Sequence, residues 1–225
     1  MFNEKRIRII TGHYGSGKTE FAVNYTMGLA AAGHKTAIVD LDIVNPYFRS
    51  REIEPLFNEK GIRVVSSSIK GLAGDLPALS PEIFSMFQDT SYEVVFDVGG
   101  DKAGATALGR YHEYLDAEPY DMLFVLNANR RQTSTVEGAI AYLRSIEEGS
   151  RQKVTGLVNN THLCGETTLE EILKGQRLVE EVAKTLGLPV KYVVAERKFA
   201  AQLPKDIQGE IFPIDIYMKK PWEKE

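Results

Sequence analysis

The feature that most constrains this chain is a glycine-rich run near its start. Residues Gly12–Thr19 read Gly-His-Tyr-Gly-Ser-Gly-Lys-Thr and match the spacing G-x-x-x-x-G-K-[ST]. A β-branched run, Ile7–Thr11, precedes it, and an amphipathic helical pattern, Lys18–Ala32, follows it. Glycines let backbone N–H groups converge on one anion, and the start of a helix adds partial positive charge. The order strand, loop, helix therefore predicts a loop that cradles phosphate; a turn of purely structural use is the alternative.

Two residues of this loop carry side chains suited to a nucleoside triphosphate. The ammonium group of Lys18 is expected to reach the β and γ phosphates, and the hydroxyl of Thr19 is expected to coordinate Mg²⁺. The residues expected to contact the phosphates are Gly12, His13, Gly15, Ser16, Gly17, Lys18 and Thr19.

Short apolar runs alternate with longer helical patterns along the rest of the chain. The expected strands are Ile7–Thr11, Thr36–Asp40, Ile62–Ser66, Glu93–Val98, Met122–Asn127, Val154–Asn159 and Val190–Ala195. The expected helices are Lys18–Ala32, Pro81–Gln88, Thr135–Glu148 and Leu169–Leu186. This rhythm predicts a three-layer α/β fold, with a mostly parallel sheet of about seven strands and helices on both faces. No linker divides the chain, so residues 1–225 are interpreted as one domain.

Acidic residues end two of the expected strands. Asp40 and Asp42 close the second strand, and Asp97, Gly100 and Asp101 follow the fourth. In an open α/β sheet, ligands bind outside the carboxyl ends of the strands, so these residues are expected to face the phosphate loop. Asp97 would hold Mg²⁺ through water, Asp42 would orient an attacking water, and the Gly100 N–H would sense the γ-phosphate. Asp and Gly are also common turn residues, so structural roles stay open, above all for Asp40 and for Asp101 as a helix cap.

Composition narrows the classes of partner. The 27 Lys and Arg residues are outnumbered by 31 Asp and Glu, which gives a net charge of −4 and disfavours general nucleic-acid binding. No apolar run approaches the roughly 20 residues that cross a bilayer, and no signal peptide is visible, so neither membrane binding nor secretion is predicted. The single cysteine, Cys164, cannot form an internal disulfide, which favours the cytoplasm.

At these motifs the chain resembles the deviant-Walker-A P-loop ATPases, the group of MinD, ParA, the nitrogenase iron protein and the arsenite-pump ATPase. The resemblance runs from Ile7 to about Gln202 and rests on Gly12–Thr19, Asp40–Asp42, Asp97–Asp101 and Gly156–Asn160. It implies an ATP-binding, Mg²⁺-dependent ATPase that dimerises with ATP. By position it implies that Asn160 contacts adenine and that Glu196 and Arg197 cover the other side of the base. A clear guanine motif is missing, since Asn127–Arg130 approaches it only distantly.

The chain departs from this group at two places. His13 stands where the group carries a signature lysine that crosses the dimer, and histidine is only partly charged at pH 7. Lys102, Arg49 or Arg51 are candidates to replace that charge. The segment after Asp101 also lacks the cluster-ligating cysteine of the iron protein, so no Fe–S cluster is expected.

The leading interpretation is a cytoplasmic Mg-ATPase that acts as a switch on an unidentified partner protein. ATP would order Asp42–Ser50 and the segment from Asp97 to Ala103, and would favour a homodimer. The alternatives are an ATP-dependent small-molecule kinase or ligase, in which the loop Ser66–Ser80 would close over an acceptor, and a nucleotide-binding module without turnover.

Overall fold

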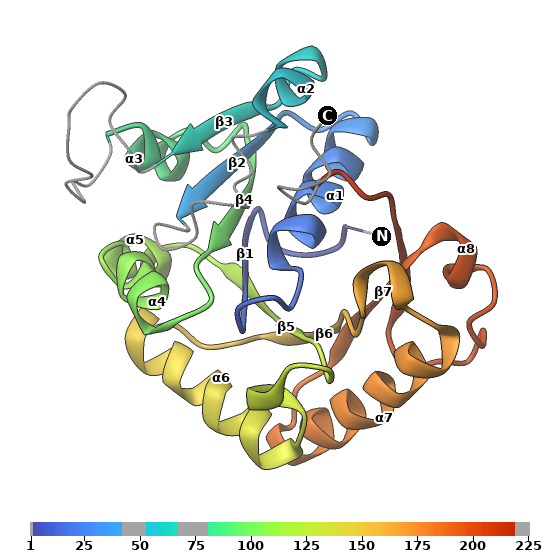
Figure 1. Cartoon of the computed structure of the whole chain (residues 1–225). Helices are drawn as coiled ribbons and strands as arrows, with labels where there is room; N and C mark the ends of the chain where they lie inside the picture. The colour runs from blue at the N-terminus through green and yellow to red at the C-terminus, as the bar shows by residue number, and fades with distance from the viewer. Residues whose placement is uncertain (1, 42–52, 67–80, 219–225) are drawn as a thin grey trace, which may run out of the picture.

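Eight strands, all parallel, form the centre of the molecule (Figure 1). The computed structural model describes residues 2–41, 53–66 and 81–218. The strands are β1 (Ile7–Gly12), β2 (Thr36–Leu41), β3 (Arg63–Ser66), β4 (Glu93–Val98), β5 (Tyr120–Leu126), β6 (Gly156–Asn159), β7 (Val190–Glu196) and β8 (Glu210–Ile214). Their order across the sheet is β3-β2-β4-β1-β5-β6-β7-β8.

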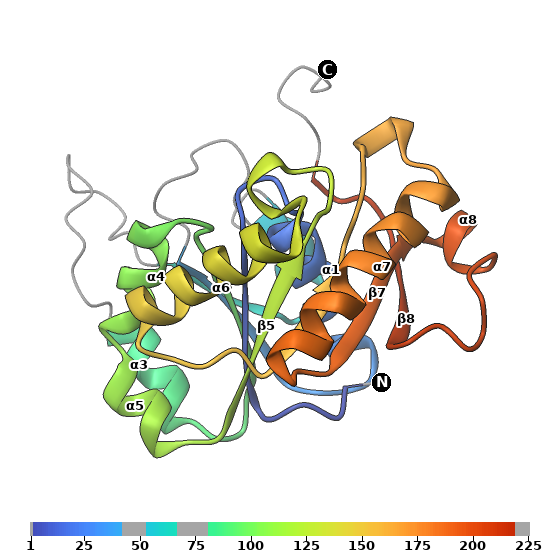
Figure 2. The same cartoon turned by 90° about the horizontal axis from the view of Figure 1, so that it is seen from below.

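Helices cover both faces of this sheet, because its central strands are apolar on both sides. The helices are α1 (Lys18–Ala31), α2 (Glu54–Glu59), α3 (Pro81–Gln88), α4 (Lys102–Gly109), α5 (His112–Ala117), α6 (Val136–Ser150), α7 (Leu169–Leu186) and α8 (Arg197–Ala200). One core lies beneath α1 and α2, where Phe21, Tyr25 and Phe57 are buried against alternate strand residues. The other core lies beneath α3 to α7, which Figure 2 shows along one side of the sheet. The three-layer α/β architecture expected from the sequence is confirmed.

Strand order locates the place where a ligand would bind. The chain runs from β1 to β2 on one side of the sheet and later to β5, β6, β7 and β8 on the other. The direction in which successive strands are added to the sheet therefore reverses at β1. Because all the strands are parallel, their carboxyl ends lie at the same edge of the sheet. Clefts at such reversal points are the usual ligand sites of open α/β sheets.

Seven of the strands were expected, and one was missed. β8 reads Glu-Ile-Phe-Pro-Ile, and Pro213 lacks the N–H that a central strand donates. The structure places β8 at the edge of the sheet, where one side of the strand needs no partner. A proline in a short run thus concealed an edge strand.

The ends of the helices follow capping chemistry. Asp101 caps α4 by accepting a 2.8 Å hydrogen bond from the Gly104 N–H, which confirms the structural role left open for it. Gly187 ends α7 with a φ of 68°, as expected. The helix expected to end at Glu148 continues through Gly149 to Ser150, and Arg151 takes the left-handed conformation there with a φ of 59°. The expected loops Asp42–Ser50 and Ser66–Ser80 lie almost wholly outside the described residues.

Candidate phosphate-binding site

The loop Gly12–Thr19 follows β1 and leads directly into α1. Its three glycines hold conformations that other residues rarely adopt, with φ of 144° at Gly12, 74° at Gly15 and 79° at Gly17. A Cβ atom on Gly12 would lie 2.2 Å from the carbonyl oxygen of Val125, so the loop also packs too tightly there for a side chain. The motif is therefore seated as expected, with Gly17 at the N-cap of α1.

Gly100 lies against this loop and beside Lys18. A Cβ atom on Gly100 would be 2.5 Å from the Gly12 carbonyl oxygen and 2.7 Å from Lys18 Nζ. Lys18 is only 5% exposed, so its ammonium group is confined to this corner. The structure thus brings together the two residues that the sequence assigned to the β and γ phosphates.

The hydroxyl of Tyr142 on α6 donates a hydrogen bond to the Gly100 carbonyl oxygen. The ring of Tyr142 also meets the ring of His13 edge-on, with centroids 4.8 Å apart. One side chain of α6 therefore contacts both the phosphate loop and the segment after β4. No local sequence pattern predicts this contact, because Tyr142 stands within an ordinary amphipathic helix.

Two buried carboxylates share the face of the sheet that α1 covers. Asp40 of β2 and Asp97 of β4 are partners in register, with exposures of 4% and 0%. Their strand neighbours two positions earlier, Ile38 and Val95, belong to the core under α1, so alternation places both acids on that side. The first two residues of α1 are Lys18 and Thr19. Carboxylate and hydroxyl oxygens are the donors that Mg²⁺ takes together with phosphate oxygens, so this set fits the expected metal.

Mg²⁺ would be shared with the nucleotide rather than held by a dedicated cage. Among the described residues, no group of three or more His, Cys, Asp and Glu side chains could hold a metal ion by itself. Sites built on one or two carboxylates and substrate phosphates are usual for Mg²⁺. Asp42, expected to orient water, lies outside the described residues.

Asn127 and Arg130, which follow β5, also hold the loop. Arg130 Nε donates to the Gly15 carbonyl oxygen at 2.8 Å. The fully buried amide of Asn127 donates to the same oxygen at 3.4 Å and to the His162 carbonyl oxygen at 3.1 Å. Asn127 therefore connects the phosphate loop to the segment after β6. Neither residue was among the expected phosphate contacts, although a polar residue at the end of an apolar strand is the same signal that identified Asp97.

Asn160 lies against the loop, at the end of β6. Its Nδ2 donates to the Ser16 carbonyl oxygen at 2.8 Å, and a Cβ atom on Gly17 would lie 2.3 Å from that nitrogen. Asn160 is 4% exposed, so its amide is held by the loop. The adenine contact that the resemblance implied for Asn160 stays a prediction.

Two histidines lie at the site, His13 within the loop and His162 after β6, and burial favours the neutral form of both. Burial lowers the pKa of His13, and the positive charges of Lys18 and Arg130 act in the same direction. Burial also lowers the pKa of His162 to about 4, with Arg130 adding to the effect and Glu196 opposing it. At pH 7, His13 therefore does not supply the charge that a lysine would carry there.

The tautomer of His162 is fixed by its own loop. Its Nδ1 accepts a 3.3 Å hydrogen bond from the Cys164 N–H, so the ring proton is on Nε2. That Nε2 is buried, has no hydrogen-bond partner among the described residues, and would lie 3.2 Å from a Cβ atom on Gly17.

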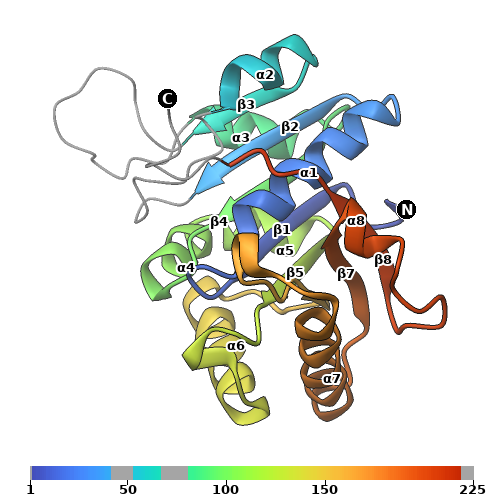
Figure 3. The same ribbon diagram turned by 45° about the vertical axis from the view of Figure 1, so that its right-hand side comes forward.

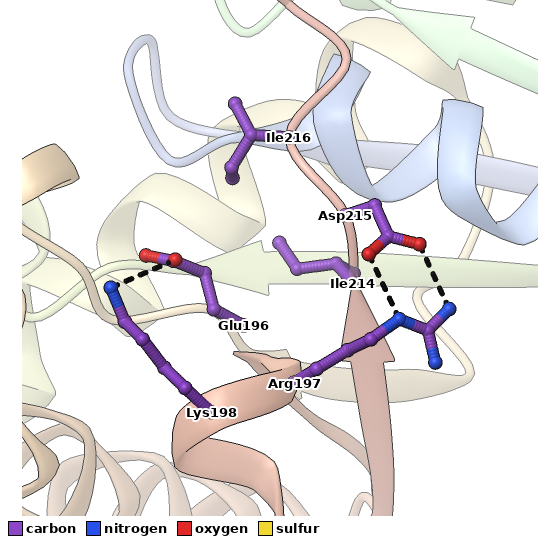
Figure 4. Close-up of a pocket in the computed structure, with 6 residues that line it drawn as sticks. All are labelled: Glu196, Arg197, Lys198, Ile214, Asp215 and Ile216. Atoms are coloured by element: carbon purple, nitrogen blue, oxygen red, sulfur yellow. Dashed lines mark hydrogen bonds and ion pairs between the residues drawn. The ribbon is translucent and has the colours of Figure 1, made fainter.

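Glu196 and Arg197 lie at the carboxyl end of β7, beside a pocket of about 180 Å³ (Figure 4). Arg197 makes a two-pronged ion pair with Asp215, with both N···O distances 2.8 Å, and Lys198 lies 3.0 Å from Glu196. Arg197 thus contacts Asp215 rather than the phosphate loop.

Comparisons with known proteins identify the fold. No protein-family model matches the chain, and no curated protein matches it in sequence. Among solved structures, chloroplast FtsY from Physcomitrella patens is similar at a TM-score of 0.55 and 18% identity, over 82% of this chain and 56% of that one. The signal recognition particle 54 kDa protein from Aeropyrum pernix, in complex with GDP, gives 0.52 and 15%, over 84% and 41%. A nucleotide-binding protein from Archaeoglobus fulgidus, in complex with ADP, gives 0.50 and 19%, over 87% and 84%.

These likenesses show that the chain has the P-loop NTPase fold. The chain spans less than two thirds of the FtsY and 54 kDa chains that it matches. No helix among the described residues is both long and apolar enough to cross a membrane.

Proposed function

We propose that this protein binds Mg-ATP, hydrolyses it, and acts as a nucleotide-dependent switch on a partner protein in the cytoplasm. The observation that carries the proposal is the convergence of Lys18 Nζ and Gly100 on the phosphate loop, with Asp40 and Asp97 in register on the α1 face. Lys18, Gly100 and Asp97 each suit a distinct task in phosphoryl transfer.

The roles on the phosphate side follow from chemistry. Lys18 neutralises the β and γ phosphates, and the loop N–H groups and the start of α1 bind the same oxygens. Thr19 and Asp97 would hold Mg²⁺, which would offset the negative charge of the phosphates. Asp42 is proposed to orient the attacking water. Gly100 contacts the γ-phosphate through its N–H, because its position beside Lys18 leaves no side chain in the way.

We propose adenine as the base. The Asn160 bond to Ser16 uses one of the two Nδ2 hydrogens, and an Asn amide pairs with the N6 and N7 edge of adenine through one donor and one acceptor. The similar Archaeoglobus fulgidus protein was solved with ADP and has almost the same extent as this chain. The Aeropyrum pernix protein was solved with GDP, so GTP is the competitor that the experiment must include.

The switch is proposed to work as in the MinD and ParA group, with ATP favouring a homodimer. Because His13 is neutral at pH 7, a dimer would need another cation to reach the partner's phosphates. Lys102, the first residue of α4, remains a candidate for that role.

Calorimetry with ATP and GTP in the presence of Mg²⁺ tests the proposal. Lys18→Ala should weaken ATP binding by roughly 10- to 100-fold, the range expected for a lost charged hydrogen bond. Lys184→Ala, on the exposed side of α7, is the matched control and should bind as the wild type does. Equal ATP affinity in the Lys18→Ala variant would contradict the assignment, and a preference for GTP would contradict adenine.

Phosphate release separates the switch from its alternatives. Release of phosphate from ATP without an added acceptor supports the ATPase. Strict dependence on a metabolite would indicate a kinase or ligase, and binding without turnover would indicate a nucleotide-binding module.

A further inference from the structure

The side chain of Arg130 lies against the phosphate loop. Its Nε donates a hydrogen bond to the Gly15 carbonyl oxygen at 2.8 Å. A Cβ atom on Gly15 would lie 2.9 Å from Arg130 Cζ and 3.1 Å from Nη2. The guanidinium therefore extends from the carbonyl oxygen across the Cα atom of Gly15, and a residue with a side chain at this position would displace it.

The segment that carries Arg130 is itself fixed at the carboxyl edge of the sheet. It joins β5 to α6, and α6 lies beside α4 (Figure 3). The Arg130 N–H donates to the carbonyl oxygen of the fully buried Asn127 at 3.1 Å, and the Arg130 carbonyl oxygen accepts from the Thr133 N–H at 2.9 Å. The turn is thus held by its own backbone, so the guanidinium meets the loop from a fixed position.

Arg130 differs from two other arginines whose side chains are buried or partly buried. Arg6 forms an ion pair with Glu118 at 2.6 Å. Arg8 pairs with Glu93. In the part of the chain that the structure describes, Arg130 has no carboxylate partner, and its two terminal amino groups make no hydrogen bond. A partly buried cation without a counter-ion costs free energy, so a structural role alone does not explain this one.

An anion bound in the loop would be the missing counter-ion. The loop already contains Lys18, and two cations in one loop repel each other unless an anion binds between them. The N–H groups of such a loop converge on the anion. From bond lengths and the usual hydrogen-bond distance, an oxygen bound to the Gly15 N–H would lie at most about 9 Å from Arg130 Nη2. Charges interact over roughly 10 Å at 0.1 M salt, so the guanidinium is close enough to act on that anion.

We infer that Arg130 is a further phosphate-binding residue, and that its terminal amino groups donate to the phosphate chain of the nucleotide bound by the same chain. The inference rests on the proposed function and adds a residue that lies outside the loop motif. Nε holds the loop through Gly15, and the terminal amino groups supply positive charge. A guanidinium suits both tasks, because it presents five N–H donors in one plane. It would supply, from the same chain, positive charge that the neutral His13 does not.

The test compares Arg130→Gln with Arg130→Lys by calorimetry with Mg-ATP and with Mg-ADP. Glutamine keeps a neutral donor but loses the charge, whereas lysine keeps the charge. Arg130→Gln should weaken binding of both nucleotides by roughly tenfold, as for one lost charged hydrogen bond. Arg130→Lys should weaken it by less than about threefold. Arg131→Gln, the same change at the exposed neighbouring position, is the matched control and should bind as the wild type does.

Salt gives a second readout, which a purely structural role would not change. Raising KCl from about 50 mM to about 500 mM should narrow the difference in ATP affinity between the wild type and Arg130→Gln, because salt screens the charge. ADP is included because the proposed switch dimerises with ATP. A loss of ADP affinity therefore reports a contact within one subunit. Urea unfolding establishes that both variants are folded under the conditions of the binding experiment.

Four outcomes would overturn the inference. Equal losses in Arg130→Gln and Arg130→Lys, or a difference that salt does not change, would mean that Arg130 only supports Gly15. A loss with ATP alone would place the contact away from the phosphates that ADP shares. Wild-type affinity in Arg130→Gln, with Lys18→Ala still impaired, would remove Arg130 from the site and leave the proposed function standing. A wild-type protein that binds neither nucleotide would overturn the proposed function and this inference together.

Discussion

Different kinds of chemical group lie on the two sides of the phosphate loop, which we call its β4 flank and its β5 and β6 flank. On the β4 flank, buried side chains of the reactive kind gather: Lys18, Asp40, Asp97 and the bare backbone of Gly100. On the β5 and β6 flank, the loop is held through its backbone carbonyl oxygens, with Asn127 and Arg130 bonded to Gly15 and Asn160 bonded to Ser16. Both flanks lie at the carboxyl edge of the sheet, because β4 and β5 are the neighbours of β1 and β6 follows β5.

This difference separates the groups that can act on phosphates from the groups that hold the loop in place, and Arg130 is the residue proposed to do both. The groups on the β4 flank can act on phosphates. Lys18, Asp40 and Asp97 carry charged side chains, and Gly100 has a backbone N–H with no side chain beside it. On the other flank, Asn127, Arg130 and Asn160 donate to carbonyl oxygens of the loop, which would cost free energy if they were buried without a partner. Changes on the amide flank should therefore reduce stability first, whereas changes on the β4 flank should reduce nucleotide binding first.

The largest expected effect on stability is that of Asn127→Ala. The buried amide donates to the Gly15 and His162 carbonyl oxygens and accepts from the Asn129 and His162 N–H groups. Its removal takes this partner from the His162 carbonyl oxygen and from the Asn129 and His162 N–H groups, whereas Gly15 keeps its bond from Arg130. The free energy of unfolding should therefore fall by about 3 kcal/mol. Urea unfolding measures this loss. Asn58→Ala, on exposed α2, is the control and should change it by less than about 0.5 kcal/mol. A loss near zero in Asn127→Ala would contradict the division between the flanks.

The next effect is a dependence of stability on pH that comes from His162. Burial and the charge of Arg130 lower its pKa to about 4 against the opposing Glu196, while the unfolded chain keeps a pKa near 6.5. Between these values the unfolded state binds more protons, so stability is complete above pH 6.5 and falls as pH decreases toward 4. By pH 5 the His162 contribution to this loss should be about 2 kcal/mol.

Comparison of the wild type with His162→Gln isolates this contribution. The difference in unfolding free energy between pH 7.5 and pH 5 should be smaller in the variant, because its side chain does not titrate. His34→Ala, at an exposed position after α1, should keep the wild-type pH dependence. If His162→Gln also keeps it, the buried neutral imidazole is not the source.

The same division explains which parts of the site the sequence could predict. Gly12–Thr19 and Asp97 stand within contiguous motifs whose spacing reports their geometry, so their meeting with Gly100 follows from the parallel sheet. Asn127 and Tyr142 act through contacts that are distant in sequence, such as that of Tyr142 with Gly100, and no local pattern encodes those. Strand β8 was missed for a similar reason. Pro213 indicates a break in a strand unless the strand is known to lie at the edge of the sheet.

The smallest expected effect is that of Tyr142→Phe, at a side chain of α6 that contacts both the phosphate loop and the segment after β4. Tyr142→Phe removes only the hydroxyl that donates to the Gly100 carbonyl oxygen and keeps the ring against His13. The free energy of unfolding should fall by about 1 kcal/mol, as for one neutral hydrogen bond, and amide hydrogen exchange near Gly100 should become faster. Tyr114→Phe, on α5 with 41% exposure, should alter neither quantity. Unchanged exchange near Gly100 would mean that the ring contact with His13, and not the hydroxyl, holds α6 to the site. In that case α6 would follow the phosphate loop itself, and a nucleotide-driven movement of Gly100 would not reach α6 through this side chain.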